Sequence, residues 1–410
     1  MKIMKKLFYI LIVIITIFPL FLLEIKVDAN ELDSSQSIYP NDPLLDEQWG
    51  LRAIRAFEGW KYEHDASNIT IAIIDSGVNY NHEDLKGNFS SSLHKTFLNL
   101  SGDVPYGSIG HHGTEIAGII GAKGNNGIGI SGVCWNANII SLKDGQEGDP
   151  INRENLINAI NYANEIGVDI INLSQGWNDY QGRYEYNDLD VYNAMKKFNG
   201  LIVCSAGNEG KNIDIYSHYP TNYDLDNIIV VGGMNSDYTP WIGSNYGKNN
   251  VDIFAPSNAF TTKNDAILYG YTEVHGTSFA APFVTGALAL LMAHHERKGN
   301  KLSALKAKEI LLNSAKKSYS LKDYCVTGGY LDLPDLLHKH EYMYEYYNKK
   351  QHRRYCLNCE DSAYENHNWT RVMEYPMQSI PNSFDPNVRM IYECVGCGAR
   401  SYGPILGDII

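Results

Sequence analysis

The stretch His275-Gly276-Thr277-Ser278-Phe279-Ala280-Ala281-Pro282 decides how the rest of this sequence is interpreted. Gly276 permits a tight turn, which would deliver Ser278 to the start of a helix. Pro282 is tolerated in a first helical turn, because the N–H that proline lacks has no partner there. The residues from Phe283 to Leu291 are apolar nearly all round, which predicts a buried helix. Taken alone, the Gly-Thr-Ser tripeptide is also an ordinary helix cap.

Upstream of this stretch, short apolar runs alternate with amphipathic segments. The runs have the length and continuity of buried parallel strands, whereas the segments between them carry apolar residues at helical spacing. This alternation predicts an α/β fold of three layers around a mainly parallel sheet, with the functional site at the carboxyl ends of the strands. We expect strands at residues 69–74, 139–142, 168–173, 201–206, 228–233 and 251–255, and helices at residues 113–121, 153–165 and 191–199.

The remaining chain divides by composition. Residues 42–59 should form a short arm and helix on the α/β domain, and residues 301–315 should form a surface helix. We expect the domain to extend from residue 40 to residue 339. A polar stretch at 340–354, rich in Tyr, Lys and Arg, is predicted to be a helical linker. Residues 355–410 contain Cys pairs and few long apolar runs, which indicates a separate small module.

Three positions on the predicted elements carry polar residues that a core does not need. Asp75 ends a buried strand, His112 opens a helix, and Ser278 follows the turn at Gly276. A hydroxyl nucleophile requires an imidazole that takes its proton and a buried carboxylate that holds the imidazole in the correct tautomer. A strand end, a helix start and a turn can hold these three groups rigidly together.

Four short motifs extend this pattern: Asp-Ser-Gly at 75–77, His-Gly-Thr at 112–114, Ser-Ala-Gly-Asn at 205–208 and Gly-Thr-Ser at 276–278. Because these motifs occur in the order Asp, His, Ser, the chain resembles the subtilisin family of serine proteases over residues 40–338. The resemblance implies that Asp75, His112 and Ser278 form the catalytic triad, with His111 as the adjacent alternative to His112. It also implies that the Asn208 side-chain amide and the Ser278 backbone N–H stabilise the oxyanion.

The resemblance extends to the substrate site. The segment with Ser174, Gln175 and Gly176 matches the family's edge segment, which pairs with an extended peptide or protein substrate through main-chain hydrogen bonds. Glu209 matches a position at the base of the pocket for the residue before the scissile bond. A carboxylate there would favour Lys or Arg, and a solvated surface Glu is the simpler alternative.

A calcium site is implied in the same way. Segments at 81–85 and 125–130 look like the family's strong Ca²⁺ site, and Asp42 in the arm would add a carboxylate. Carboxylate and carbonyl oxygens are the ligands that Ca²⁺ prefers, whereas a plain Asn-Gly turn is the alternative. The ligands that the resemblance implies are Asp42, Asp84, Asn126 and the carbonyl groups of Gly124, Ile128 and Ile130.

The N-terminus has the pattern of a secretory signal. Lys2, Lys5 and Lys6 precede an uncharged apolar run at residues 7–23, and Ala29 follows at a position suited to cleavage. The run is also nearly long enough to span a membrane, so residues 1–29 form either a cleaved signal peptide or a signal anchor. Both alternatives predict an extracytoplasmic protein, either secreted or attached to the membrane or cell wall.

The seven Cys residues fall into two groups. Cys134, Cys204 and Cys325 are scattered, and we expect them to be inert buried thiols. The other four form two C-x-x-C pairs, which predict a zinc-ribbon-like module with a structural Zn²⁺; disulfides are the alternative in an exported protein. The expected zinc ligands are Cys356, Cys359, Cys394 and Cys397, with His352 and His367 as fallback ligands.

These observations predict an exported serine endopeptidase that needs no cofactor for catalysis. The net charge of −13 argues against a nucleic-acid partner. A narrow-specificity processing protease is an alternative, because only about ten residues separate Ala29 from the arm at Asp42, too few for an inhibitory prodomain. A non-catalytic peptide-binding protein on the same fold is the alternative from another class.

Overall fold

The computed structural model describes residues 38–89, 92–98, 111–178, 186–264, 270–338, 342–348, 350–356, 362–366, 369–374, 390–394 and 400–402. The chain forms two compact units, Met1–Leu337 and His338–Ile410. The predicted signal segment, residues 1–29, lies outside the described residues.

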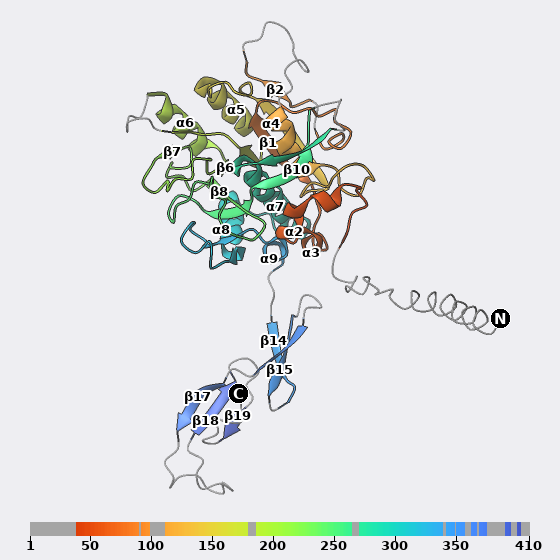
Figure 1. The fold of residues 1–410 in the computed structure, drawn as a ribbon, viewed down its shortest axis with the longest axis vertical. Helices are drawn as coiled ribbons and strands as arrows, with labels where there is room; N and C mark the ends of the chain where they lie inside the picture. Colours follow the sequence, from red (N-terminus) through yellow and green to blue (C-terminus); the bar gives the residue numbers. More distant parts are fainter. Residues whose placement is uncertain are drawn as a thin grey trace, which may run out of the picture. The chain divides into compact units, whose positions relative to one another are not determined.

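The first unit is built on one large sheet (Figure 1). Its described strands lie in the order β12 (Lys316–Lys317), β13 (Gly329–Tyr330), β9 (Ile253–Pro256), β8 (Ile228–Met234), β6 (Leu201–Ser205), β4 (Ile170–Leu173), β1 (Asp65–Asp75), β3 (Asn136–Lys143) and β2 (Lys95–Thr96). Neighbouring strands are parallel, except that β12 and β13 are antiparallel. The sheet is therefore mainly parallel, as the sequence predicts.

The predicted strands are present as β1, β3, β4, β6, β8 and β9. Every residue of β4, β6 and β8 is buried, as expected for parallel strands that are covered on both faces. Strand β1 begins at Asp65, earlier than predicted, and a register shift between Ala66 and Thr70 separates its polar start from its apolar end.

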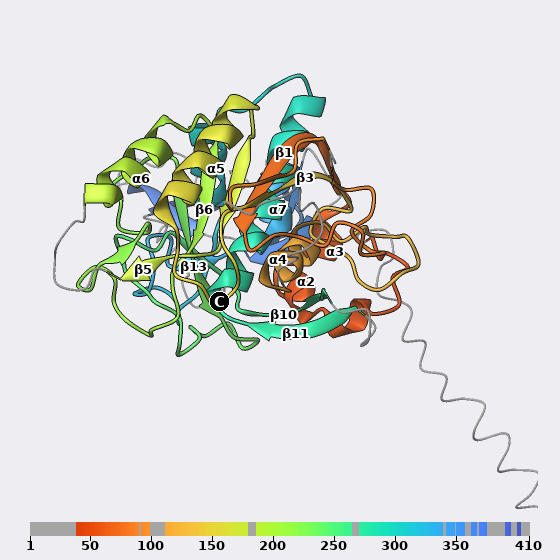
Figure 2. The same ribbon diagram turned by 90° about the horizontal axis from the view of Figure 1, so that it is seen from above.

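Helices cover both faces of the sheet. Alternate residues of β1 enter two different cores, Ile71 and Ile73 the first, Ala72 and Ile74 the second. The first core contains residues of α2 (Trp49–Ala53), α3 (Ala56–Gly59), α4 (His111–Gly121), α7 (Thr277–Arg297), α8 (Ala304–Ser314) and α9 (Leu333–Leu337). The second contains residues of α5 (Arg153–Glu165) and α6 (Tyr186–Lys197), which lie side by side in Figure 2. This is the predicted three-layer arrangement.

Helix α7 is the central helix of the first core, and all its residues from Phe279 to His294 are buried. It is long and apolar enough to cross a membrane, but 94% of its most apolar window is buried inside the fold. Gly276, with φ of 144°, precedes the helix in a conformation that residues with side chains rarely adopt. The position predicted for Pro282 was wrong, because α7 already begins at Thr277 and Pro282 therefore lies in its second turn.

Short elements connect these layers. The arm contains η1 (Leu45–Glu47) before α2. Strand β5 (Trp177–Asn178) pairs with β7 (His218–Tyr219), and the hairpin of β10 (Asn258–Thr262) and β11 (Tyr271–His275) leads directly into α7.

The described part of the second unit forms two small antiparallel sheets. One consists of β14 (Tyr342–Tyr346), β15 (Gln351–Cys356) and β16 (Ser362–Asn366), and the other of β17 (Trp369–Glu374), β18 (Met390–Cys394) and β19 (Arg400–Tyr402). The helical linker predicted at 340–354 was therefore wrong. The aromatic residues of Tyr-Met-Tyr-Glu-Tyr at 342–346 favour a strand, and this preference prevails over the Lys and Arg content of the segment.

Candidate active site

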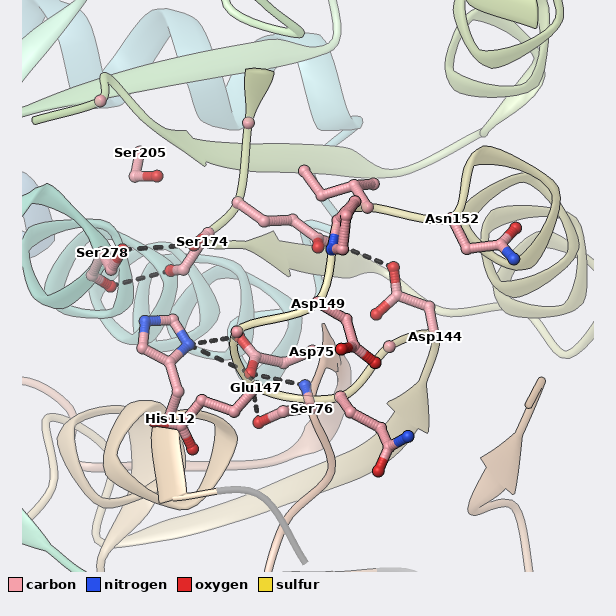
Figure 3. A pocket seen from close by; sticks show the side chains of 18 of the residues that line it. Asp75, Ser76, His112, Asp144, Glu147, Asp149, Asn152, Ser174, Ser205 and Ser278 are labelled. Carbon is pink, nitrogen blue, oxygen red and sulfur yellow. Dashed lines mark hydrogen bonds and ion pairs between the residues drawn. The ribbon is translucent and has the colours of Figure 1, made fainter. Parts of the chain in front are cut away.

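The three residues of the predicted triad meet at the carboxyl edge of the sheet. Asp75 is the last residue of β1, and His112 and Ser278 lie in the first turns of α4 and α7. His112 Nδ1 lies 2.8 Å from Asp75 Oδ2 and 3.1 Å from Asp75 Oδ1. Figure 3 shows the other ring nitrogen of His112 turned toward Ser278. His111 is exposed and its backbone N–H donates to Glu147, so His112 is the histidine beside Asp75.

The Asp75 carboxylate is buried and receives donors besides His112. Ser76 donates to Asp75 Oδ1 from its backbone N–H at 2.6 Å and from its hydroxyl at 2.9 Å. Burial acts to raise the pKa of Asp75, but the charge of His112 and these hydrogen bonds hold it below its ordinary value. Burial acts to lower the pKa of His112, but Asp75 raises it above its ordinary value. The contact with an ionised Asp75 places a proton on His112 Nδ1, so that Nε2 is the acceptor whenever the ring is neutral.

A glycine brings α4 and β1 close enough for this contact. A Cβ atom on Gly113 would lie 2.4 Å from the carbonyl oxygen of Gly77 and 3.3 Å from Asp75 Oδ1. Any side chain at position 113 would therefore push the start of α4 away from the end of β1.

The Ser278 hydroxyl donates to the carbonyl oxygen of Ser174 at 3.2 Å. Among the described residues, no hydrogen bond joins Ser278 to His112. Bonds of this kind are often long without substrate and shorten when substrate binds. A hydroxyl beside an imidazole that is oriented by a buried carboxylate can act as a nucleophile toward an acyl group.

Asn208 lies beside the start of α7. Its Oδ1 accepts hydrogen bonds from the backbone N–H of Thr277 at 2.9 Å and from the Thr277 hydroxyl at 2.8 Å. These bonds hold the amide with its Nδ2 donor free of any described partner. The Ser278 N–H belongs to the first turn of α7, where backbone N–H groups lack helical partners. The two donors can together hold a negatively charged oxygen.

A buried polar network that sequence reasoning missed supports this arrangement. The Ser174 hydroxyl donates to the carbonyl oxygen of Ser278 at 2.8 Å and accepts from Asn172 Nδ2 at 2.9 Å. Asn172 Oδ1 in turn accepts from the Thr285 hydroxyl at 2.9 Å. The available signal was the presence of Asn172 within an apolar strand and of Thr285 within an apolar helix.

A model of the subtilase family of peptidases matches residues 66–334. The chain belongs to the subtilase family of serine proteases. The match includes Asp75, His112, Asn208 and Ser278.

Two curated relatives illustrate the range of the family. The subtilase is 33% identical over 298 residues to the major intracellular serine protease of Bacillus subtilis, covering 70% of this chain and 89% of that protein. It is 30% identical over 262 residues to halolysin from Haloferax mediterranei, covering 62% of this chain. The aligned part spans about half (47%) of halolysin.

Solved structures show the same fold. The epidermin leader peptide processing serine protease from Staphylococcus aureus is 25% identical, with a TM-score of 0.61 over 73% of this chain and 82% of that one. The nisin leader peptidase from Lactococcus lactis is 24% identical, with a TM-score of 0.59 over 72% of this chain and 94% of that one.

A cleft of about 360 Å³ lies beside Ser278 in the subtilase. The predicted substrate residues Ser174, Gln175, Gly176 and Glu209 all line it. Its described lining also includes the carboxylate residues Asp75, Asp144, Glu147 and Asp149, and it includes no Lys or Arg. The cleft is therefore suited to a substrate that carries positive charge.

Glu209 is turned toward the side of the cleft that contains His218. Both Glu209 Oε2 and His218 Nε2 lie 2.8 Å from the position of a Cβ atom on Gly207. Glu209 Oε2 also accepts from Asn245 Nδ2 at 2.6 Å, which holds the carboxylate in place. Burial lowers the pKa of His218, and the charge of Glu209 acts against this. The lowered pKa therefore favours the neutral form of the His218 imidazole beside the Glu209 side chain.

The residues of the predicted calcium site come together. Asp42 accepts from the backbone N–H groups of Asn125 (2.8 Å) and Asn126 (3.0 Å). Asp84 accepts from the N–H of Ile130 at 2.8 Å and from Asn126 Nδ2 at 2.9 Å. Burial is the main cause that raises the pKa of Asp84, to about 6, and the charge of Asp42 contributes.

The carbonyl oxygens in this loop fit the same prediction. Between described residues, no hydrogen bond reaches the carbonyl oxygens of Gly124, Ile128 or Ile130, so these oxygens can accept a cation. However, N–H donors already occupy part of each carboxylate. The described residues contain no group of three or more His, Cys, Asp or Glu side chains that could hold a metal ion.

The cysteines fall into two structural groups. Cys134, Cys204 and Cys325 are free, buried thiols, and burial raises the pKa of each, as expected for inert cysteines. Cys356 is the last residue of β15, and Cys394 is the last residue of β18. Cys359, Cys397 and the fallback ligand His367 lie outside the described residues, whereas His352 lies in β15.

Proposed function

We propose that this subtilase is an exported serine endopeptidase with Asp75, His112 and Ser278 as its catalytic triad. The contact between His112 Nδ1 and Asp75 Oδ2 at 2.8 Å carries the proposal, because it orients the imidazole toward Ser278. Ser278 Oγ attacks the peptide carbonyl carbon while His112 Nε2 takes its proton, and His112 then protonates the leaving amine. Asn208 Nδ2 and the Ser278 N–H stabilise the oxyanion.

Labelling by a fluorophosphonate probe tests this proposal. We expect the exported protein to be labelled and the Ser278→Ala variant not to be labelled. A matched control is Ser205→Ala, since Ser205 also lines the cleft but has no role in the proposed chemistry. Failure of the wild-type protein to label with Ca²⁺ and Zn²⁺ present would favour a non-catalytic peptide-binding protein.

A narrow-specificity processing protease is the second candidate, and the acidic cleft favours it. The solved structures with this fold include proteases named for processing the leader peptides of epidermin and nisin. Glu209 is the residue that we propose to select Lys or Arg before the scissile bond. Peptides with Arg, Leu or Phe at that position test this, because Glu209→Gln should remove a preference for Arg. Digestion of casein at many sites would contradict narrow specificity.

We propose that Ca²⁺ is held by Asp42, Asp84, Asn126 and the carbonyl groups of Gly124, Ile128 and Ile130. The buried carboxylates and the free carbonyl oxygens support this proposal. A chelator should lower the melting temperature of the wild-type protein, and it should have no effect on the Asp84→Asn variant.

We propose that Cys356, Cys359, Cys394 and Cys397 hold a structural Zn²⁺ in the second unit. Each C-x-x-C pair begins at the end of a strand, β15 or β18, and precedes its antiparallel neighbour, β16 or β19. Metal analysis should find one zinc per chain, and thiol titration should distinguish zinc from disulfides. Export through residues 1–29 predicts mature protein that begins at Asn30, or a membrane-bound form if the signal is retained as an anchor.

A further inference from the structure

Asp144 is a carboxylate that the proposed chemistry does not use. It directly follows β3, whose neighbour β1 ends at Asp75, and it lines the same cleft as Ser278. Only 2% of Asp144 is exposed. One carboxylate oxygen, Oδ2, accepts from Gln175 Nε2 at 2.7 Å. The other, Oδ1, is buried and has no hydrogen-bond partner in the described part of the chain.

An unpartnered buried carboxylate oxygen is costly, because the charge has lost its water without gaining a donor. The charged groups that act on it do not compensate. Asp75, at the end of β1, raises the pKa of Asp144 by its negative charge, and the opposing effect of the Lys143 charge is smaller, since Lys143 donates its hydrogen bond to the carbonyl oxygen of Ser76. Burial first, and then Asp75, raise the pKa of Asp144 to about 7, although the bond from Gln175 opposes this.

Asp144 lies on one wall of the cleft, close to the segment proposed to bind the substrate backbone. Figure 3 shows Asp144 and Asn152 on the wall of the cleft away from Ser278 and His112. Asp149, in the loop that follows β3, also lines the cleft and is exposed, whereas Glu147 in the same loop accepts from the backbone N–H of His111 and so lies beside the start of α4. Gln175 joins the wall to the segment proposed to pair with the substrate backbone. A substrate paired with that segment therefore runs past Asp144.

We propose that Asp144 is the floor of a second specificity pocket, which binds a Lys or Arg side chain of the substrate other than the residue before the scissile bond. The inference rests on the proposed peptidase function. A cationic side chain supplies the donor that Asp144 Oδ1 lacks, and Gln175 holds the carboxylate in position for it. The preferred substrate is then a segment with two basic residues, one facing Glu209 and one facing Asp144.

A scan of peptide pairs tests the pocket. The two peptides of a pair carry Lys or norleucine at the same position, and this position differs from pair to pair. Norleucine has an unbranched side chain of similar length without the charge. We expect one position, distinct from the one before the scissile bond, at which kcat/KM is at least about tenfold higher for the Lys peptide than for the norleucine peptide. This ratio corresponds to the free energy of a charge-assisted hydrogen bond. Asp144→Asn should reduce this ratio to near one at that position alone.

Asp149→Asn is the matched control, because it removes one charge from an exposed carboxylate in the same loop. It should change the Lys-to-norleucine ratio less than about twofold, since exposed charges interact weakly. Equal effects of the two variants would show a diffuse charge effect and would overturn the pocket. So would the absence of any position that favours Lys.

The pH dependence of the same ratio provides a measurement on the wild-type protein. Titration of His112 and Asp75 affects both peptides of a pair equally, so it cancels in the ratio. Because ionised Asp144 binds Lys better, the ratio should rise as the pH increases through about 7. A flat ratio would overturn the proposal even if Asp144→Asn does not fold. If the fluorophosphonate probe does not label the wild-type protein, the proposed peptidase function itself is refuted.

Discussion

Pro282 creates a testable gap in the hydrogen bonding of α7. In a regular helix, the N–H of residue 282 would donate to the carbonyl oxygen of Ser278, but proline has no N–H. The Ser174 hydroxyl donates to this oxygen instead, at 2.8 Å. We predict that Ser174→Ala is strongly destabilising, and that Pro282→Ala removes part of the loss by restoring the helical donor.

The expected magnitude follows from the buried groups that lose partners. Ser174→Ala leaves both the Ser278 carbonyl oxygen and Asn172 Nδ2 without the Ser174 hydroxyl, and Asn172 is fully buried. Each unsatisfied buried group costs about 1–3 kcal/mol, so the substitution should lower the free energy of unfolding by about 2–6 kcal/mol. In the Pro282→Ala background, only the Asn172 loss remains, and the cost should fall by about 1–3 kcal/mol.

A double-mutant cycle by urea unfolding measures this difference. All four proteins should carry Ser278→Ala, which prevents self-digestion and keeps the backbone carbonyl group of residue 278. Other effects of Pro282→Ala on the helix and on the unfolded chain cancel in the cycle. If Ser174→Ala costs the same with and without Pro282, the Ser174 hydroxyl does not compensate for the proline, and the reasoning is refuted.

Three further predictions concern the site and its surroundings. Asn208→Ala should lower kcat by about 10²–10³ with little change in KM, the loss known for the corresponding subtilisin asparagine; a change confined to KM would argue against an oxyanion role. Asp75→Asn should lower kcat by about 10⁴ in steady-state assays, because the wrong tautomer of His112 is favoured, and activity near the wild-type level would exclude this role. Burial raises the pKa of Asp84 to about 6, above about 4 in the unfolded chain, so the folded state binds more protons in this range. In chelator, the Asp84 contribution to the free energy of unfolding should therefore fall as pH rises from about 4 to 6. Asp84→Asn should remove this slope, and an identical slope in wild type and variant would disprove the assignment.

The sequence was most informative where local pattern and chemistry coincide. Apolar runs such as 69–74 predicted the buried strands, because a parallel strand covered on both faces needs continuous apolar residues. Asp75 and Ser278 stood out because they interrupt such runs at the ends of elements. In the structure, Asp75 is the last residue of β1 and Ser278 lies in the first turn of α7, as predicted.

The rest could not be predicted because it depends on contacts between distant segments. The Ser174–Ser278 bonds join residues 104 positions apart, and no local signal indicates this pairing. Asp144 in Lys-Asp-Gly resembles a residue of an exposed turn, yet it is buried and accepts a hydrogen bond from Gln175, 31 positions away. At 342–346, the charges of the neighbouring residues outweighed the β-preference of Tyr in our prediction.

The position of Ser278 on α7 limits how this peptidase can be regulated. The helix is buried from Phe279 to His294 and packs against β1, β4, β6, β8 and β9, so a movement of the helix that carries Ser278 would disturb the core. We therefore expect a regulator to control the access of substrate to Ser278 and not the position of Ser278. It can fill the cleft or bind the exposed loop residues 146–150 that line it. During thermal unfolding, the fraction of active molecules should therefore equal the fraction of folded molecules at every temperature. No folded but inactive form should accumulate.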